Sequence, residues 1–135
     1  MSRSGYSDGC DSWDLIRWRG AVASAIRGKR GQAFLSEMVE ALDALPAPRL
    51  ISDKLVNECG DCCAIGSVAL RREIETAEID PYDRCYVARV FGISEALAAE
   101  IAYKNDEHFT IETPEQRFAR VRAWVVSKLA AEEKP

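Results

Sequence analysis

Residues 87–106 have the sequence VARVFGISEALAAEIAYKND, and this stretch decides the fold class. Apolar residues recur at helical spacing before and after Phe91-Gly92-Ile93-Ser94, where glycine permits a turn and serine can cap a new helix. The stretch therefore predicts two short helices joined by a tight corner. The side chains expected to face the interior are Tyr86, Val87, Val90, Leu97 and Ile101.

Two longer helices are expected nearer the N-terminus. The first should begin at Asp11 or Ser12 and end near Gly28, and the second should bury a wide apolar stripe before Pro46 stops it. Between them, the basic segment Gly28-Lys29-Arg30-Gly31 is expected to form a turn. A turn this short predicts that the two helices pack antiparallel as a hairpin. The first helix is expected to bury Leu15, Trp18, Val22 and Ile26.

The rest of the chain continues the helical pattern. Residues 62–72 alternate small and apolar groups at helical spacing, and Asp80-Pro81 has the features of a helix start. The segment 113–116 (TPEQ) predicts a capping box, because Thr113 can accept a bond from the backbone of Gln116 while the Gln116 side chain reaches back. Residues 49–60 are the least regular part and allow a short β-hairpin.

Together these patterns predict an all-α fold, a single compact domain of five to six helices over residues 11–131, preceded by a flexible segment at 1–10. The length of 135 residues suits one domain, and the apolar fraction of 47% is ordinary for a globular protein. The first, second and last helices are expected to supply most of the core. No apolar run approaches the ~18 residues that span a bilayer, so no membrane partner is expected.

The corner at residues 87–101 has the layout of a helix-turn-helix, which raises DNA binding as a function. The outward positions of its second helix are expected to be Glu95, Ala96, Ala99 and Glu100. Glutamates repel the phosphate backbone, and only Lys104, at the far end, is basic. Duplex DNA is therefore not the expected partner, and a small DNA-binding regulator is kept as the alternative.

The five cysteines predict neither a metal site nor a disulfide framework. Cys59 and Cys62 form one CxxC pair, but a zinc site needs a second pair of ligands. Cys10, Cys85 and His108 are isolated, and free cysteines commonly act as small buried apolar groups. No nucleophile elbow, glycine-rich phosphate loop or HExxH helix is present. The sequence therefore predicts no catalytic residue, no metal and no cofactor, and a protein that is not an enzyme.

Charge marks two candidate contact surfaces. The net charge is −4, but residues 80–112 carry 7 acidic and 3 basic groups, while basic groups gather near residues 17–30. The basic turn can contact an anionic partner, and the acidic flank at Glu95–Glu107 is the other option. The candidate partner-binding residues are Arg17, Arg27, Lys29, Arg30, Glu95 and Glu100.

Four short motifs give the chain a family resemblance. In these motifs, and over most of its length, it resembles small uncharacterised proteins encoded by bacteriophages and prophages of Gram-negative bacteria. The resemblance carries over no catalytic residue, and the shared pattern does not include Cys59, Cys62 or Cys85. The motifs are Trp18-Arg19-Gly20-Ala21-Val22, residues 26–35 (IRGKRGQAFL), Cys63-Ala64-Ile65-Gly66 and Asn105-Asp106.

The resemblance implies a mobile genetic element that acts inside a bacterial host. The N-terminal residues also lack the apolar core of a signal peptide, so a cytoplasmic location is expected. Small phage proteins without visible catalysis often bind a host protein, and inhibitors of host defence, including anti-CRISPR proteins, are one such class. We therefore expect a non-enzymatic phage-type protein that binds a host protein or ribonucleoprotein complex, such as a CRISPR-Cas defence system.

Overall fold

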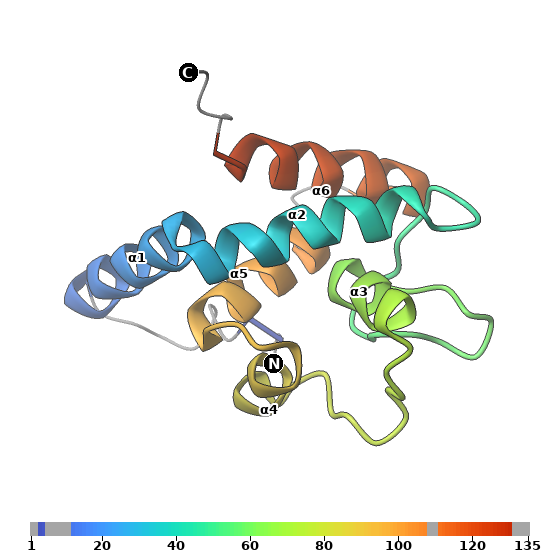
Figure 1. Cartoon of the computed structure of the whole chain (residues 1–135), viewed down its shortest axis with the longest axis horizontal. Coiled ribbons are helices and arrows are strands. Elements are labelled where there is room, and N and C mark those ends of the chain that lie inside the picture. Colours follow the sequence, from blue (N-terminus) through green and yellow to red (C-terminus); the bar gives the residue numbers. More distant parts are fainter. Residues whose placement is uncertain (1–2, 5–11, 108–110, 131–135) are drawn as a thin grey trace.

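The computed structural model describes residues 3–4, 12–107 and 111–130, and these form an all-helical domain with no strand among them, as the sequence predicts (Figure 1). In this bundle α2 and α6 pack side by side and run in opposite directions. The six helices are α1 (Ser12–Arg27), α2 (Lys29–Asp43), α3 (Ala64–Arg72), α4 (Arg84–Phe91), α5 (Glu95–Asp106) and α6 (Pro114–Lys128).

A single residue, Gly28, separates α1 from α2. Its backbone is extended (φ −68°, ψ 158°), whereas Lys29 and Arg30 already belong to the first turn of α2. Figure 1 shows the two helices end to end with a bend between them. The predicted four-residue turn and antiparallel hairpin are therefore wrong. The helices approach closely at the bend because Gly31 has no side chain: a Cβ there would lie 1.8 Å from the Ala25 carbonyl oxygen.

The centre of the core is α5, together with α2 and α3. Seven residues of α5 are buried, and α1, α3, α4 and α6 all contact this helix. Its many alanines explain this position, because small side chains let several helices approach one axis. The prediction that α1 and α6 join α2 as the main core helices is wrong. Among the described residues, α1 fully buries only Val22, and α6 buries Val121 and Val125.

The corner between α4 and α5 is confirmed. Gly92 ends α4 in the left-handed conformation (φ 72°), which glycine adopts without strain. Ser94 then caps α5 by accepting a hydrogen bond from the Leu97 N–H at 3.1 Å. Leu97 and Ile101 are buried, as expected.

The start of α4 differs from the prediction. Asp80-Pro81 lies in a turn, and Asp83 is the N-cap, accepting from the Tyr86 N–H. This later start sets which face of the short helix is inward. Val87 is buried, whereas Tyr86 is 44% exposed and its predicted burial is wrong.

The capping box of α6 is confirmed. Thr113 Oγ1 accepts from the Gln116 N–H at 3.1 Å, and Gln116 Oε1 accepts from the Thr113 N–H at 2.8 Å. Pro114 occupies the first helical position, where its missing N–H leaves no bond unmade. Local sequence alone was therefore sufficient to place the beginning of this helix.

The β-hairpin allowed at residues 49–60 is reduced to one antiparallel bridge, between Val56 and Cys62. The Asn57 side chain holds the intervening turn, since its Oδ1 accepts from the N–H groups of Cys59 and Asp61, both at 2.9 Å. The chain enters α3 two residues after the bridge, which leaves no length for a strand.

Several predictions concern groups outside the described residues. They are the side chain of Leu15, the residues Cys10 and His108, most of the segment 1–10, and the chain after residue 130. Within the described ranges, no helix combines the length and the apolar character needed to cross a bilayer.

Candidate functional site at the end of α5

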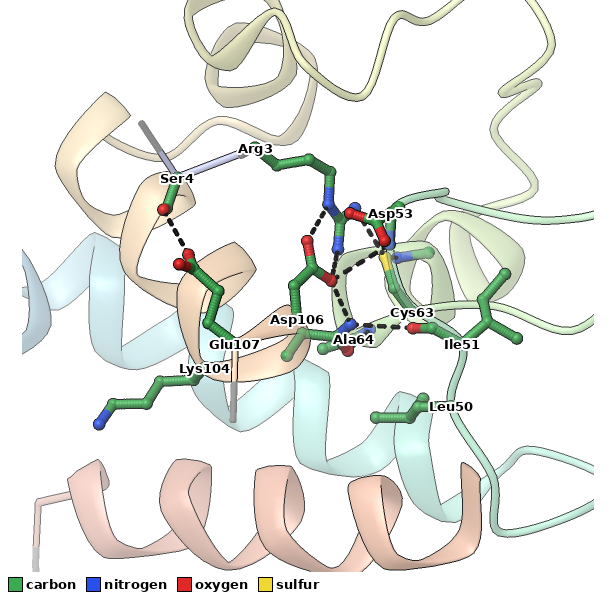
Figure 2. A network of polar contacts seen from close by, with 12 residues as sticks. Arg3, Ser4, Leu50, Ile51, Asp53, Cys63, Ala64, Lys104, Asp106 and Glu107 are labelled. Atoms are coloured by element: carbon green, nitrogen blue, oxygen red, sulfur yellow. Dashed lines mark hydrogen bonds and ion pairs between the residues drawn. The ribbon is translucent and has the colours of Figure 1, made fainter. Parts of the chain in front are cut away.

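A buried polar cluster lies where the end of α5 meets the beginning of α3 (Figure 2). Its central side chain, Asn105, is 1% exposed. Asn105 Oδ1 accepts from the Ala64 N–H at 3.0 Å, and Asn105 Nδ2 donates to the Ile51 carbonyl at 2.9 Å. Because Ala64 is the first residue of α3, its N–H has no partner within that helix. One amide side chain therefore pairs with a backbone N–H at the start of a helix and with a backbone carbonyl of a loop, both far from Asn105 in sequence.

Asp106 receives the guanidinium of Arg3 in the same cluster. Arg3 Nε and Nη2 donate to the two carboxylate oxygens at 2.6 and 2.5 Å, and the two side chains are 2% and 7% exposed. A bidentate pair of this kind is the strongest form of arginine–carboxylate contact. Burial alone lowers the pKa of Arg3, but the neighbouring Cys63 sulfur and Asp106 carboxylate outweigh it and raise the pKa, so the guanidinium stays charged.

Cys63 is the N-cap residue of α3, and its sulfur is the acceptor that a side-chain oxygen usually provides. It accepts from the Gly66 N–H at 3.4 Å and from Arg3 Nη1 at 3.5 Å. The sulfur is therefore enclosed by a helix start and a buried cation. In this position it holds two elements together.

Ser4 extends the contact made by Arg3. Its hydroxyl donates to Glu107 Oε2 at 2.7 Å, and Arg84 Nη1 donates to its carbonyl oxygen at 2.6 Å. The flexible segment expected at residues 1–10 thus contains two residues that are 2% and 1% exposed. Arg3 and Ser4, which we call the N-terminal arm, link α3, α4 and the end of α5.

Asp53 lies beside the cluster with its backbone in the left-handed region (φ 65°), which is unfavourable for a residue with a side chain. Its N–H donates to Asp106 Oδ1 at 3.2 Å, and its carboxylate accepts from the Tyr82 hydroxyl at 3.3 Å. Asp53 and Tyr82, but not Asp106, border an open groove of about 380 Å³ that is lined also by Thr76 and Ile79. The cluster therefore reaches the surface at this edge.

The carbonyl groups at the end of α5 are satisfied by arginines of α6. Arg117 Nε donates to the Asn105 carbonyl at 3.0 Å, and Arg120 donates to the Lys104 carbonyl. Glu112 pairs with both arginines, at 3.4 Å from Arg117 and 2.6 Å from Arg120. The last turn of α5 is thus held on its backbone side as well as through its side chains.

Gly66 allows α3 to lie against the loop before it. A Cβ at this position would be 1.9 Å from the Leu55 carbonyl oxygen. That oxygen is itself fixed, since it accepts from the Cys63 N–H at 3.0 Å. Only glycine fits this close approach of two backbone segments.

Two motifs noted in the sequence therefore meet in space. Cys63-Ala64-Ile65-Gly66 begins α3, and Asn105-Asp106 ends α5, and they are joined by the hydrogen bonds just described. Sequence reasoning found the motifs but assigned them no role. It missed Arg3 altogether, because an arginine in a polar, glycine- and serine-rich terminus gives no sign of burial.

The polar groups of this cluster are paired with one another and hold parts of the fold together. Its carboxylate is paired with a guanidinium, and its amide makes hydrogen bonds at both ends. Burial, with the neighbouring Cys63 and Asp61, raises the pKa of Cys62 to about 12, so this thiol stays protonated. No three His, Cys, Asp or Glu side chains converge in the described part of the chain as a metal site would require.

We expect N-ethylmaleimide to label Cys59 in the native protein and to leave Cys62 unmodified. Cys59 is exposed and Cys62 is buried, and at pH 8 a thiol with a pKa of about 12 is only ~0.01% thiolate. Peptide mass spectrometry after a short pulse of reagent measures both sites, with the unfolded protein as the control that labels both. Equal labelling in the native protein would show that the loop at 57–62 opens readily.

The candidate partner-binding residues chosen from the sequence lie on other elements. Arg27, Lys29 and Arg30 are exposed around the bend between α1 and α2. Glu95 is exposed at the start of α5, with a carboxylate oxygen 4.0 Å from Arg84 Nε. Glu100 is half-buried. The structure therefore places none of these residues in the buried cluster.

The remaining basic candidate, Arg17, is exposed on α1 and interacts within the chain.

Comparison of the chain with known proteins identifies no relative. The chain matches no model of a known protein family, no curated protein and no solved structure.

Proposed function

We propose that this protein is a non-enzymatic binding protein that docks onto an anionic face of a host protein or ribonucleoprotein complex. The contact is made through Arg27, Lys29 and Arg30, which we call the cationic corner. One observation carries the proposal: these three side chains are exposed, and none has a hydrogen-bonded or ion-paired partner among the described residues. Unneutralised charge of one sign favours and steers association with a surface of the opposite sign.

Apart from Arg19, the arginines outside the corner interact with other groups of the chain, which distinguishes most of them from the corner residues. Arg72 and Arg122, for example, each make a bidentate contact, with Glu37 and Asp43 respectively. Within the described ranges, carboxylates of the chain pair with Arg3, Arg49, Arg71, Arg72, Arg84, Arg117, Arg120 and Arg122.

The surface of α1 next to the corner supports close contact with a partner. Gly20, Ala21 and Ser24 are exposed there and have small side chains or none. A partner can therefore approach the helix backbone while its acidic groups meet the corner.

The sequence resemblance is the basis for three further parts of the proposal: a phage origin, a cytoplasmic location, and a defence system such as CRISPR-Cas as the target. Identification of the partner tests them.

The alternative, a DNA-binding regulator that uses the α4–α5 corner, is less well supported by the geometry. The positions expected to face outward on α5 include Ala96 and Ala99, which are 8% and 0% exposed. That expectation is wrong because α1 packs against α5. A recognition helix needs a free face to enter the major groove.

Affinity capture from a Gram-negative host lysate tests the proposal, with the tag placed after Pro135. We expect the unaltered protein to retain a stable complex. The amount of partner captured by the Arg27→Glu/Arg30→Glu variant should be lower by at least about tenfold. The matched control is Lys54→Glu/Lys128→Glu, which changes the charge by the same amount at two exposed sites elsewhere.

Two results would contradict the proposal. The first is a complex that survives reversal of the corner, or that both double variants lose equally. The second is salt-sensitive retention of duplex DNA that Lys104→Glu abolishes, which would support the regulator. Nuclease treatment of the captured material separates a protein partner from a ribonucleoprotein one.

A further inference from the structure

We propose that the polar cluster around Asp106 is a recognition site for an Arg-Ser segment of a polypeptide, and that the N-terminal arm of this chain occupies the site as a tethered ligand. This site is anionic, whereas the cationic corner has the opposite charge and lies on other helices. The proposal therefore goes beyond the function proposed above and is tested separately.

The arginine half of the segment is recognised by charge and by shape. The Asp106 carboxylate accepts two parallel hydrogen bonds from Arg3, and the Cys63 sulfur accepts a third. The planar guanidinium fits this fork, whereas the ammonium of lysine cannot bridge both oxygens with the same geometry. Arg3 is 2% exposed, and the cavity beside it measures about 10 Å³, room for one water at most.

The serine half is recognised through a side chain and a backbone group. Glu107 accepts from the Ser4 hydroxyl at 2.7 Å, and Arg84 donates to the Ser4 carbonyl at 2.6 Å. Free arginine has neither the serine hydroxyl nor the serine carbonyl that these two contacts use. The contacts therefore select a segment of polypeptide over the free amino acid, which carries the same guanidinium.

The arm is joined to α1 by the sequence GYSDGCD at residues 5–11, which contains two glycines and no aliphatic residue. Because the arm belongs to the same chain as the site, it competes with any free peptide as an intramolecular ligand. An Arg-Ser segment of another polypeptide then competes with the arm for the same contacts. Residues 3–4 thus close the site until a stronger ligand replaces them.

The test uses the full chain with Arg3→Ala/Ser4→Ala, which empties the site. The probe is a fluorescent peptide with the sequence of residues 2–5, Ser-Arg-Ser-Gly, followed by anisotropy and by thermal shift. We expect binding to this variant, binding at least about tenfold weaker when citrulline replaces arginine, and weaker binding of free arginine. The protein with its own arm should bind the peptide more weakly than the emptied variant.

Asp106→Asn in the emptied variant is the matched change in the site, and it should abolish binding. If the emptied variant is unfolded alone, recovery of its helical circular dichroism by the peptide counts as binding. Arg3→Lys, which keeps a positive charge in the arm, is the second variant and should bind the peptide with intermediate affinity. Failure of the peptide to bind or restore the emptied variant, or equal binding of the citrulline peptide, would overturn the proposal.

Discussion

Replacement of Gly66 by alanine is expected to destabilise the protein by about 3 kcal/mol or more, and to lower its melting temperature by roughly 10 °C. The new Cβ would lie 1.9 Å from the Leu55 carbonyl oxygen and 2.7 Å from its carbon. These are backbone atoms, and a hydrogen bond from the Cys63 N–H holds the oxygen in place. Either α3 or the loop must therefore move, which disturbs the buried cluster that both of them help to form.

Gly20→Ala is the matched control for this substitution. Gly20 lies within α1, and a Cβ added there would meet nothing within 4 Å, so alanine should stabilise the protein by about 0.5–1 kcal/mol. Thermal and urea unfolding followed by circular dichroism measure both variants. A Gly66→Ala protein as stable as the parent would show that the loop at residues 51–55 yields without penalty.

The substitution Asn105→Asp is expected to destabilise the protein by about 3 kcal/mol at neutral pH. The carboxylate can still accept from the Ala64 N–H, but it cannot donate to the Ile51 carbonyl as the amide does at 2.9 Å. It also places a second negative charge beside Asp106, whose Oδ1 accepts from Asn105 Nδ2 at 2.8 Å. The substitution therefore leaves the Ile51 carbonyl without this donor, and it brings two negative charges together in a buried position.

The effect of this substitution should depend on pH in a defined direction. Burial and the neighbouring carboxylate would raise the pKa of the new aspartate in the folded state above its value in the unfolded chain. The destabilisation is then fully present above the folded-state pKa, and it decreases as the pH falls through that value and a proton restores a donor. Chemical unfolding at several pH values, compared with the parent at each, measures this difference.

Asn57→Asp is the control, because Asn57 Oδ1 accepts two hydrogen bonds and a carboxylate can accept the same two. We expect its effect to stay within about 1 kcal/mol at every pH. If Asn105→Asp were equally mild, the amide of Asn105 would not be needed to hold α5 against α3.

Sequence signals that are local in origin were reliable in this protein. The corner at Gly92 and Ser94 and the capping box at Thr113 and Gln116 follow from the conformations and hydrogen bonds of a few adjacent residues. Such signals are sufficient to give the all-α class and most helix boundaries. They do not say how close the next helix is, which is why the sequence predicts a four-residue turn where the structure has a bend at Gly28.

The position of α5 could not be predicted from its pattern. Alanines give little hydrophobic contrast between faces, so the pattern placed Ala96 and Ala99 on an exposed surface. Their small size instead allows α1 to pack against α5, and both are buried. Burial of small residues depends on which helices come together, which is a property of the whole fold.

The candidate site was visible only in pieces. The motifs that include Cys63 and Asn105 were noticed, yet nothing in either one indicates that the two meet. Arg3 was missed because its partner lies in another part of the chain and because polar termini are usually exposed. A site assembled from three separate segments leaves no spacing that a single sequence can reveal.

The contact between Arg3 and Asp106 joins residues 103 positions apart, with consequences for how the protein is made. A ribosome adds about 5–20 residues per second, so Arg3 exists for roughly 5–20 s before its carboxylate partner is synthesised. Arg3 can therefore reach its native place only after the chain has been made as far as Asp106. A nascent chain that stalls before Asp106 would leave the Arg3 guanidinium without its carboxylate partner.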